Sequence, residues 1–156
     1  MPRVWRVFHS LFAGLSGDRL ALPYRVPIVA LVVDEPDRRV LASVADRELW
    51  DIHFAESCGD VCAAAKQLIA PVVLLDRDWP GTEWKTDVQR LAASPHYACV
   101  ILISGVADVY LWEEVVRRGG YDVLPKPLQA DKVARIVKLA TSYGLAHPSR
   151  VSAGKV

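Results

Sequence analysis

Acidic, hydroxyl and amine side chains follow the short apolar runs of this sequence, and together they could transfer a phosphoryl group. Asp34 and Glu35 follow the first run, Asp76 and Ser104 follow two later runs, and Lys126 follows the last. Carboxylates that gather at one place repel one another unless a cation neutralises them, and Mg²⁺ is a hard cation that prefers oxygen ligands. A carboxylate beside Mg²⁺ can also attack phosphorus, while a lysine and a hydroxyl bind the transferring oxygens.

Short strands alternating with helices must position these side chains. Continuous apolar runs are typical of strands buried on both faces of a parallel sheet. They predict strands over Ile28–Val33, Val72–Leu75 and Val100–Ile103, with weaker strands over Trp50–Ala55 and Tyr121–Leu124. Apolar residues at helical spacing predict helices over about 37–48, 58–69, 83–93, 107–118 and 130–143. This order predicts a doubly wound α/β fold, a five-stranded parallel sheet between two helical layers, with a site at the carboxyl ends of the strands.

Composition excludes several classes of protein. The chain has 156 residues, a formal net charge of +1, 52% hydrophobic and 24% charged residues, which is typical of a globular domain and not of a disordered chain. Near-neutral charge gives no general attraction to nucleic acid, so we expect no direct nucleic acid binding. The longest apolar runs, Pro27–Val33, Leu68–Leu75 and Ala98–Ile103, are too short to span a membrane.

The cysteines do not indicate a disulfide framework or a metal site. There are three, Cys58, Cys62 and Cys99, an odd and small number. Cys58 and Cys62 lie four residues apart, and His53 is the nearest further metal ligand in the sequence. We therefore expect the cysteines to be small apolar residues of helices and strands.

The first 26 residues are expected to be an extension of a domain that covers residues 27–145, with a tail at 146–156. The extension lacks the unbroken apolar core of a signal peptide, so we expect a cytoplasmic protein. Apolar residues recur at helical spacing over residues 3–15 and predict one amphipathic helix. That segment either docks on a partner or a membrane surface, folds onto its own domain, or is a poorly ordered extension. Pro23 and Pro27 bracket the linker that follows.

Four segments, in order and at matching spacing, resemble the receiver domain of two-component response regulators, over about residues 28–143. The segment VVLLDRDWPG (72–81) is similar to the phospho-acceptor segment of that family, and VILIS (100–104) to its Ser/Thr-bearing strand. The segment GGYDVLPKPL (119–128) resembles the closing strand with its Lys-Pro pair, and ALVVDEPDRRVL (30–41) resembles the acidic segment.

The resemblance implies a fold and a set of roles. The strand order would be 2-1-3-4-5, as in flavodoxin-like and CheY-like proteins. Asp76 would accept a phosphoryl group from a histidine kinase or phosphotransfer protein, assisted by Lys126 and Ser104. Mg²⁺ would be held by Asp34, Glu35, Asp76 and the backbone carbonyl of Asp78, and a cis bond would precede Pro127. We expect a signalling domain rather than an enzyme with a separate substrate, with a homodimer as a candidate assembly.

The sequence departs from the family pattern at several positions. The acidic segment is about one residue shorter than usual, which affects Glu35. Val123 lies where the family often has an aromatic switch residue, and Tyr121 lies two residues earlier. Trp84 replaces a common glycine, and Trp79 replaces a common methionine. These departures favour a second hypothesis, a phosphorylation-independent interaction module with the same fold.

Structural roles remain open for the same residues. Asp76 could cap a turn, Asp34 and Glu35 could be the acidic start of a helix, and Ser104 could cap the helix over 107–118, as could Asp108. Lys126 could be a solvated side chain. Tyr110 and Trp112 are expected either on a partner-binding face or, especially for Trp112, in the core or exposed by chance.

A third function class has little support. A nucleotide-binding enzyme would need a glycine-rich phosphate loop after the first strand, and the sequence there is DEPDRR. Only 13 residues follow the last predicted helix, too few for a DNA-binding domain, so we expect the chain to act by binding another protein.

Overall fold

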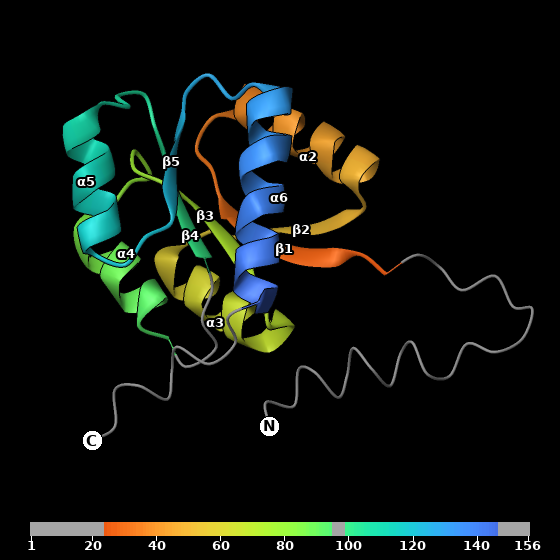
Figure 1. The fold of residues 1–156 in the computed structure, drawn as a ribbon, viewed down its shortest axis with the longest axis horizontal. Coiled ribbons are helices and arrows are strands. Elements are labelled where there is room, and N and C mark those ends of the chain that lie inside the picture. The colour runs from red at the N-terminus through yellow and green to blue at the C-terminus, as the bar shows by residue number, and fades with distance from the viewer. Residues whose placement is uncertain (1–23, 95–98, 147–156) are drawn as a thin grey trace, which may run out of the picture.

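The computed structural model describes residues 24–94 and 99–146, and its elements alternate along the chain (Figure 1). The strands form one parallel sheet of five, ordered β2-β1-β3-β4-β5, which confirms the predicted architecture and strand order. The strands are β1 (Val26–Leu31), β2 (Trp50–Phe54), β3 (Val72–Asp76), β4 (Cys99–Ser104) and β5 (Asp122–Pro125). The helices are α2 (Glu35–Glu48), α3 (Cys58–Leu68), α4 (Trp84–Ala92), α5 (Val109–Arg117) and α6 (Ala130–Ala146).

Strand β1 begins two residues before its predicted start. Its pairing with β2 begins at Val26 opposite Trp50, whereas its pairing with β3 begins only at Ile28. Pro27 therefore lies where β1 has a neighbour on one side only, so its missing N–H costs little. Val26 and the last residue of α6, Ala146, each lie one residue outside the expected domain limits of 27–145. The predicted helix over residues 3–15 lies outside the described residues.

The helices begin and end where local chemistry sets the limits. Helix α2 starts at Glu35 rather than 37, because a proline at Pro36 fits the first turn. Helix α3 is capped by Ser57, whose hydroxyl accepts a 3.0 Å hydrogen bond from the Asp60 N–H. Helix α5 starts after Asp108, whose Oδ1 accepts a 2.8 Å bond from the Leu111 N–H. Asp108, and not Ser104, is therefore the N-cap residue of α5.

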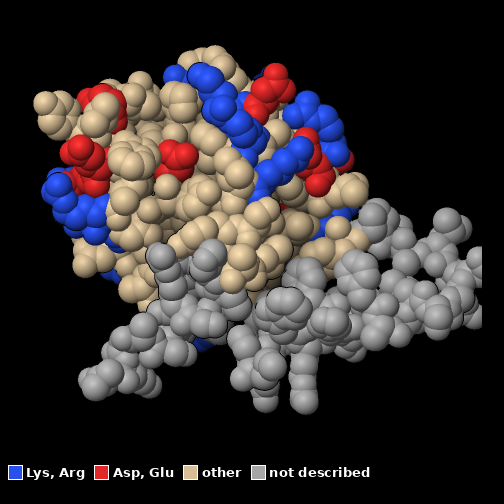
Figure 2. Space-filling view, in the orientation of Figure 1, with Lys and Arg blue, Asp and Glu red and all other residues tan. Residues whose placement is uncertain are grey.

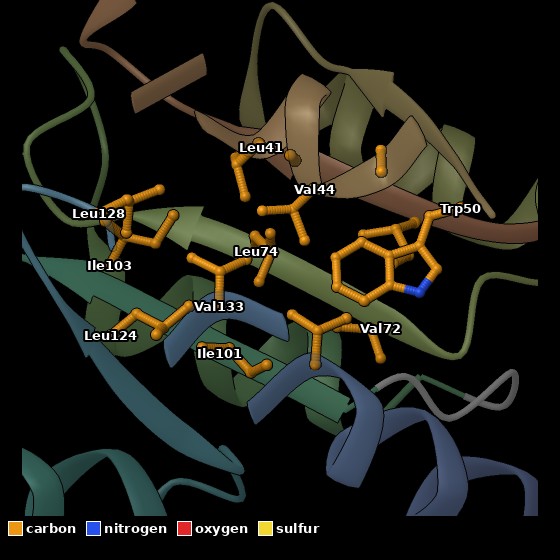
Figure 3. Packing of buried hydrophobic residues seen from close by; sticks show 14 of the residues in the cluster. Leu41, Val44, Trp50, Val72, Leu74, Ile101, Ile103, Leu124, Leu128 and Val133 are labelled. Carbon is orange, nitrogen blue, oxygen red and sulfur yellow. The ribbon is translucent and has the colours of Figure 1, made fainter. Parts of the chain in front are cut away.

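Two hydrophobic layers hold the sheet between the helices. On one face, α2 and α6 cover the sheet; Figure 3 shows Leu74 of β3 between Leu41 and Val44 of α2 and Val133 of α6. On the other face, α3, α4 and α5 pack on the opposite side chains of the same strands. Both faces are covered, so β3 and β4 are buried along their whole length, as their continuous apolar sequences predict.

None of Cys58, Cys62 and Cys99 forms a disulfide bond, and Cys58 and Cys62 pack against the layer of α3 and α4. Within residues 24–94 and 99–146, no helix is both long enough and apolar enough to cross a lipid bilayer.

Candidate functional site

The polar strand ends meet at one edge of the sheet. Asp76 is the last residue of β3 and lies opposite Ile103, so Ser104 follows one position later at the end of β4. Ser104 in turn lies opposite Pro125, and Lys126 follows β5 immediately. Because the strands are parallel and in register, three chain segments far apart in sequence place their polar side chains together.

Lys126 is the centre of this site. Its ammonium nitrogen lies 2.7 Å from Oδ1 of Asp76, 3.1 Å from Oδ2 of Asp34 and 3.3 Å from Oδ2 of Asp78. The Asp76 side chain is 0% exposed, Lys126 is 11% exposed, and Asp34 and Asp78 are 51% and 60% exposed. Asp34 and Asp78 therefore form the solvent side of the cluster, and Asp76 its floor.

Backbone groups hold the Asp76 carboxylate in place. The Val33 N–H donates a 3.0 Å bond to Oδ2, and the Asp78 N–H donates a 3.0 Å bond to Oδ1. Together with Lys126, they satisfy a carboxylate that is fully removed from water. The sequence did not predict either donor, because the type of a residue does not indicate whether its backbone N–H faces a site.

Electrostatics keep Lys126 charged. Burial by itself would lower the pKa of Lys126, but its hydrogen bonds to Asp76 and Asp34 and the negative charge of Asp76 outweigh burial. The pKa of Lys126 is therefore raised above its ordinary value. By formal charge the site has one ammonium group and three carboxylates, an excess of negative charge that suits a further cation.

Ser104 is buried beside this cluster, 1% exposed. Its Oγ accepts a 3.1 Å hydrogen bond from the Val106 N–H, and its carbonyl accepts a 3.0 Å bond from the Lys126 N–H. The backbone of Ser104 thus fixes the position of Lys126 just after β5, while the hydroxyl hydrogen of Ser104 remains able to donate.

The two acids that follow β1 have different surroundings. Asp34 occupies the N-cap position of α2, makes no capping hydrogen bond with its side chain, and pairs with Lys126 instead. Glu35 has a side chain that is 63% exposed and forms a 3.5 Å ion pair with Arg39, four residues along α2. The ion pairs of Lys126 within the described residues thus join it to Asp34 and not to Glu35, which separates two acids that the sequence grouped.

A buried carboxylate that the sequence analysis overlooked supports the Lys126 loop. Asp37, in the first turn of α2, is 4% exposed, and its Oδ1 accepts a 2.8 Å hydrogen bond from the Leu128 N–H. The peptide bond between Lys126 and Pro127, just before Leu128, is cis, as the family resemblance implied. An aspartate at the third position of a helix is ordinarily explained by its favourable interaction with the helix dipole. Only the buried environment of Asp37 reveals that it supports the loop at Leu128.

The donor set fits a hard cation in part. Asp34, Asp76 and the Asp78 carbonyl can supply the few oxygen ligands that Mg²⁺ takes from a protein, with water completing its shell. As arranged here, however, no group of three or more His, Cys, Asp or Glu side chains in the described ranges converges on a metal position. Lys126 lies on the carboxylate oxygens that such an ion would use, so an ion and Lys126 would have to share or exchange them.

The positions that depart from the family pattern lie around this site or in the sheet. Val123 is buried in β5, 8% exposed, and Tyr121 packs its ring against Tyr143 with centroids 5.6 Å apart. Trp79 and Trp84 pack partly buried against the layer of α3 and α4. Of the aromatic residues expected on α5, Trp112 is not in the core: it is 46% exposed, and Tyr110 is 82% exposed.

Comparison with known proteins identifies the fold. No protein-family profile matches this sequence, and no curated protein matches it. Among solved structures, a putative response regulator from Chloroflexus aurantiacus is similar with a TM-score of 0.68 and 16% identity, over 76% of this chain and 99% of that one. The signal receiver domain of a putative LuxO repressor protein from Vibrio parahaemolyticus is similar with a TM-score of 0.68 and 19% identity, over 79% and 95% of the chains.

Two further solved structures are similar, one of them to only part of a larger protein. NtrX from Brucella abortus is similar with a TM-score of 0.68 and 20% identity, over 79% of this chain but 28% of that one. A response regulator from Thermotoga maritima is similar at a TM-score of 0.68 over 99% of its own length. The sheet order, the arrangement of helices and these likenesses together lead to one conclusion: this chain has the fold of a response-regulator receiver domain.

Proposed function

We propose that this protein is a signal-receiver domain in which Asp76 accepts a phosphoryl group from a histidine kinase or phosphotransfer protein, in a Mg²⁺-dependent reaction. The observation that carries the proposal is the contact of Lys126 with Asp76, Asp34 and Asp78 at the carboxyl ends of the strands. A fully buried carboxylate held by two backbone N–H groups and one lysine is an oriented nucleophile, and a carboxylate oxygen needs no general base to attack phosphorus.

The chemistry assigns a task to each side chain. A carboxylate oxygen of Asp76 forms a bond to phosphorus as the bond from phosphorus to the donor nitrogen breaks, and that nitrogen keeps the electron pair. Lys126 neutralises charge on the transferring oxygens, and the Ser104 hydroxyl donates a hydrogen bond to one of them. Mg²⁺, held by Asp34, Asp76 and the carbonyl of Asp78, would supply further charge neutralisation.

Access to the acceptor requires Lys126 to move. Asp76 is 0% exposed, and the ammonium group covers Oδ1 at 2.7 Å. The ammonium group of Lys126 would move from the Asp76 carboxylate to the phosphoryl oxygens. Lys126 belongs to the loop that directly follows β5. The surface around residues 104–128 is therefore the one that would change and be bound by a downstream protein.

A second candidate function is the phosphorylation-independent interaction module. The observations that favour it are the ion pair that keeps Glu35 with Arg39 and the position of Lys126 on the carboxylates that Mg²⁺ would use. In this function the ion pairs of Lys126 with Asp34, Asp76 and Asp78 are a permanent structural cluster. Binding to partners then does not depend on a phosphoryl donor.

The intact mass of the protein separates the two functions. We would incubate the full chain with Mg²⁺ and acetyl phosphate and expect a gain of one phosphoryl group. The Asp76→Asn variant and a sample without metal should gain nothing. Asp87→Asn is the matched control, because Asp87 is also buried, 8% exposed, but lies on α4; it should be modified like the wild type.

Each outcome of this experiment is informative. A gain that Asp76→Asn retains would place the modification elsewhere and overturn the assignment of Asp76. No gain in a folded wild-type protein, with a donor shown to be active on another receiver domain, would overturn the phospho-acceptor proposal in favour of the interaction module.

A further inference from the structure

Exposed apolar side chains gather at the end of the sheet opposite Lys126. The strands are parallel and each helix runs back against them, so the strand starts and the ends of α2, α3 and α6 lie at the same end (Figure 1). Large apolar residues there are 38–45% exposed. We call them the strand-start patch: Tyr24, Leu49, Leu68, Ile69 and Leu145.

The strand-start patch surrounds the point where the chain enters the sheet. Tyr24 precedes β1, which lies between β2 and β3, and the Val26 N–H donates a 3.2 Å bond to the Leu49 carbonyl. Ile69 precedes β3 on the other side. The end of α6 is adjacent, because a Cβ on Gly144 would lie 3.2 Å from the Pro71 carbonyl oxygen. The patch therefore borders β1 on both sides.

Two members of the patch have a backbone conformation that their side chains disfavour. Leu49 and Ile69 follow α2 and α3 with φ of 59° and 51°, in the left-handed region where helices usually end in glycine or asparagine. For a β-branched residue such as Ile69 this is an outlier. Outliers of this kind are typical of positions where the side chain has a role beyond the local turn, and here both side chains are bulky, apolar and exposed.

The chain itself supplies an apolar segment at this place. Residues 3–15 carry a helical stripe of large apolar side chains, which consists of Val4, Val7, Phe8, Leu11, Phe12 and Leu15. A helix of this length would be about 20 Å long. The eight residues 16–23 connect it to Tyr24 and reach at most about 27 Å when extended. A tether this short gives an effective concentration in the millimolar range, with no cost of bringing a separate partner.

We propose that residues 3–15 form an amphipathic helix that packs its apolar stripe on the strand-start patch of the same chain. The tether begins between the residues of the patch, and the stripe supplies the apolar surface that would cover them. Residues 147–156 follow the end of α6 in the sequence, but they read HPSRVSAGKV, with two valines as the only large aliphatic residues and no aromatic ring other than His147. They cannot provide a comparable stripe.

Another exposed apolar surface is the competing binding place. On and before α5, Val106, Val109, Tyr110, Trp112 and Val116 are 41–82% exposed. Figure 2 shows many uncharged side chains on the face that α5, β5 and α6 share, interrupted by Lys and Arg side chains from its upper edge to its middle and by acidic ones on its left. Nothing tethers residues 3–15 to this surface, whereas Tyr24 lies within the strand-start patch.

Amide hydrogen exchange of the full chain tests the proposal. We expect amides of residues 3–15 to exchange at least about tenfold more slowly in the wild type than in a synthetic peptide of residues 1–20, because a docked helix is protected. The double variant Leu49→Asn/Ile69→Asn should abolish that protection. Asparagine tolerates the left-handed conformation, so the fold is retained. Continued protection of β3 and β4 amides in the same experiment checks this.

Control variants separate the possible binding places. Phe8→Asp/Leu11→Asp should also remove the protection, and Trp112→Asn on α5 should leave it unchanged. Exchange at peptide rates in the wild type would overturn the proposal. So would protection that survives Leu49→Asn/Ile69→Asn or that Trp112→Asn abolishes. Protection that increases with protein concentration, together with a dimer in sedimentation, would assign the segment to a second copy of the chain and overturn docking within one chain.

Discussion

Oδ1 of Asp37 accepts a 2.8 Å hydrogen bond from the Leu128 N–H, and this bond joins the first turn of α2 to the loop that carries Lys126. The two residues are 91 positions apart in the sequence. Asp34, three residues before Asp37, and Lys126, two residues before Leu128, are themselves in contact at 3.1 Å. The bond therefore holds together the two segments from which the site is built.

Removing the Asp37 carboxylate should loosen this connection. Asp37→Ala leaves the buried Leu128 N–H without an acceptor, which costs about 2 kcal/mol of unfolding free energy. Asp37→Asn keeps an acceptor oxygen and should cost less than half of that. Urea denaturation measures both. The control is Asp46→Asn, since the Asp46 side chain is 86% exposed and its change should stay within about 0.5 kcal/mol. Equal effects of Asp37→Ala and Asp46→Asn would contradict the role of Asp37.

The two acids after β1 should differ in Mg²⁺ binding. Asp34 belongs to the Lys126 cluster, whereas Glu35 pairs with Arg39 and is 63% exposed. Asp34→Asn would remove one of the proposed Mg²⁺ ligands and should weaken Mg²⁺ binding by about tenfold or more. Glu35→Gln should change it by less than about threefold, through long-range charge alone. Calorimetric titration of both variants provides the comparison, and a larger effect of Glu35→Gln would restore Glu35 as the ligand.

The charge of Lys126 should stabilise the fold over a defined pH range. Its pKa is raised in the folded protein, so its contribution is complete below the pKa of an unfolded lysine, about 10.4, and is lost as the pH rises through the higher folded value. Lys126→Met should lower the free energy of unfolding by about 2 kcal/mol near neutral pH. This loss of unfolding free energy is smaller than the loss usually caused by breaking a buried ion pair, because Asp76 keeps its hydrogen bonds from two backbone N–H groups.

The pH profile of this variant provides the test. The difference between wild type and Lys126→Met should be constant from pH 7 to about 10 and should shrink at higher pH. Lys132→Met, which changes an exposed lysine of α6, is the control and should show little difference at any pH. A difference that grew with increasing pH would have the wrong sign and would exclude this account of Lys126.

Glycine 120 should tolerate no side chain. A Cβ on Gly120 would lie 2.5 Å from Cγ1 of Val115 and 3.1 Å from Cγ1 of Val88, inside the layer of α4 and α5. Gly120→Ala should therefore destabilise the protein by about 1–3 kcal/mol through overpacking. Gly105→Ala is the matched control, because a Cβ there has nothing within 4 Å. Thermal unfolding of the two variants should separate them, and equal melting temperatures would refute the steric argument.

The sequence predicted the sheet because its strands have a strong and local signal. Val72–Leu75 and Val100–Ile103 are continuous apolar runs, and residues buried on both faces of a sheet must be apolar whatever else surrounds them. The predicted starts of two elements were each two residues late. Strand β1 begins at Val26, where it pairs with β2 alone, and α2 begins at Glu35, where Pro36 fits the first turn. These depend on pairing and turn geometry, which a single segment does not contain.

The candidate site was predicted in its members and only partly in its geometry. That Asp34, Asp76, Ser104 and Lys126 lie together follows from their places after parallel strands, which the sequence by itself determines. Only the tertiary structure decided that the Asp78 side chain joins them, that Glu35 pairs with Arg39, and that Asp37 is buried under Leu128. The physical reason is that strand order fixes where a side chain begins, whereas its direction depends on loop dihedrals, rotamers and competing partners from distant segments.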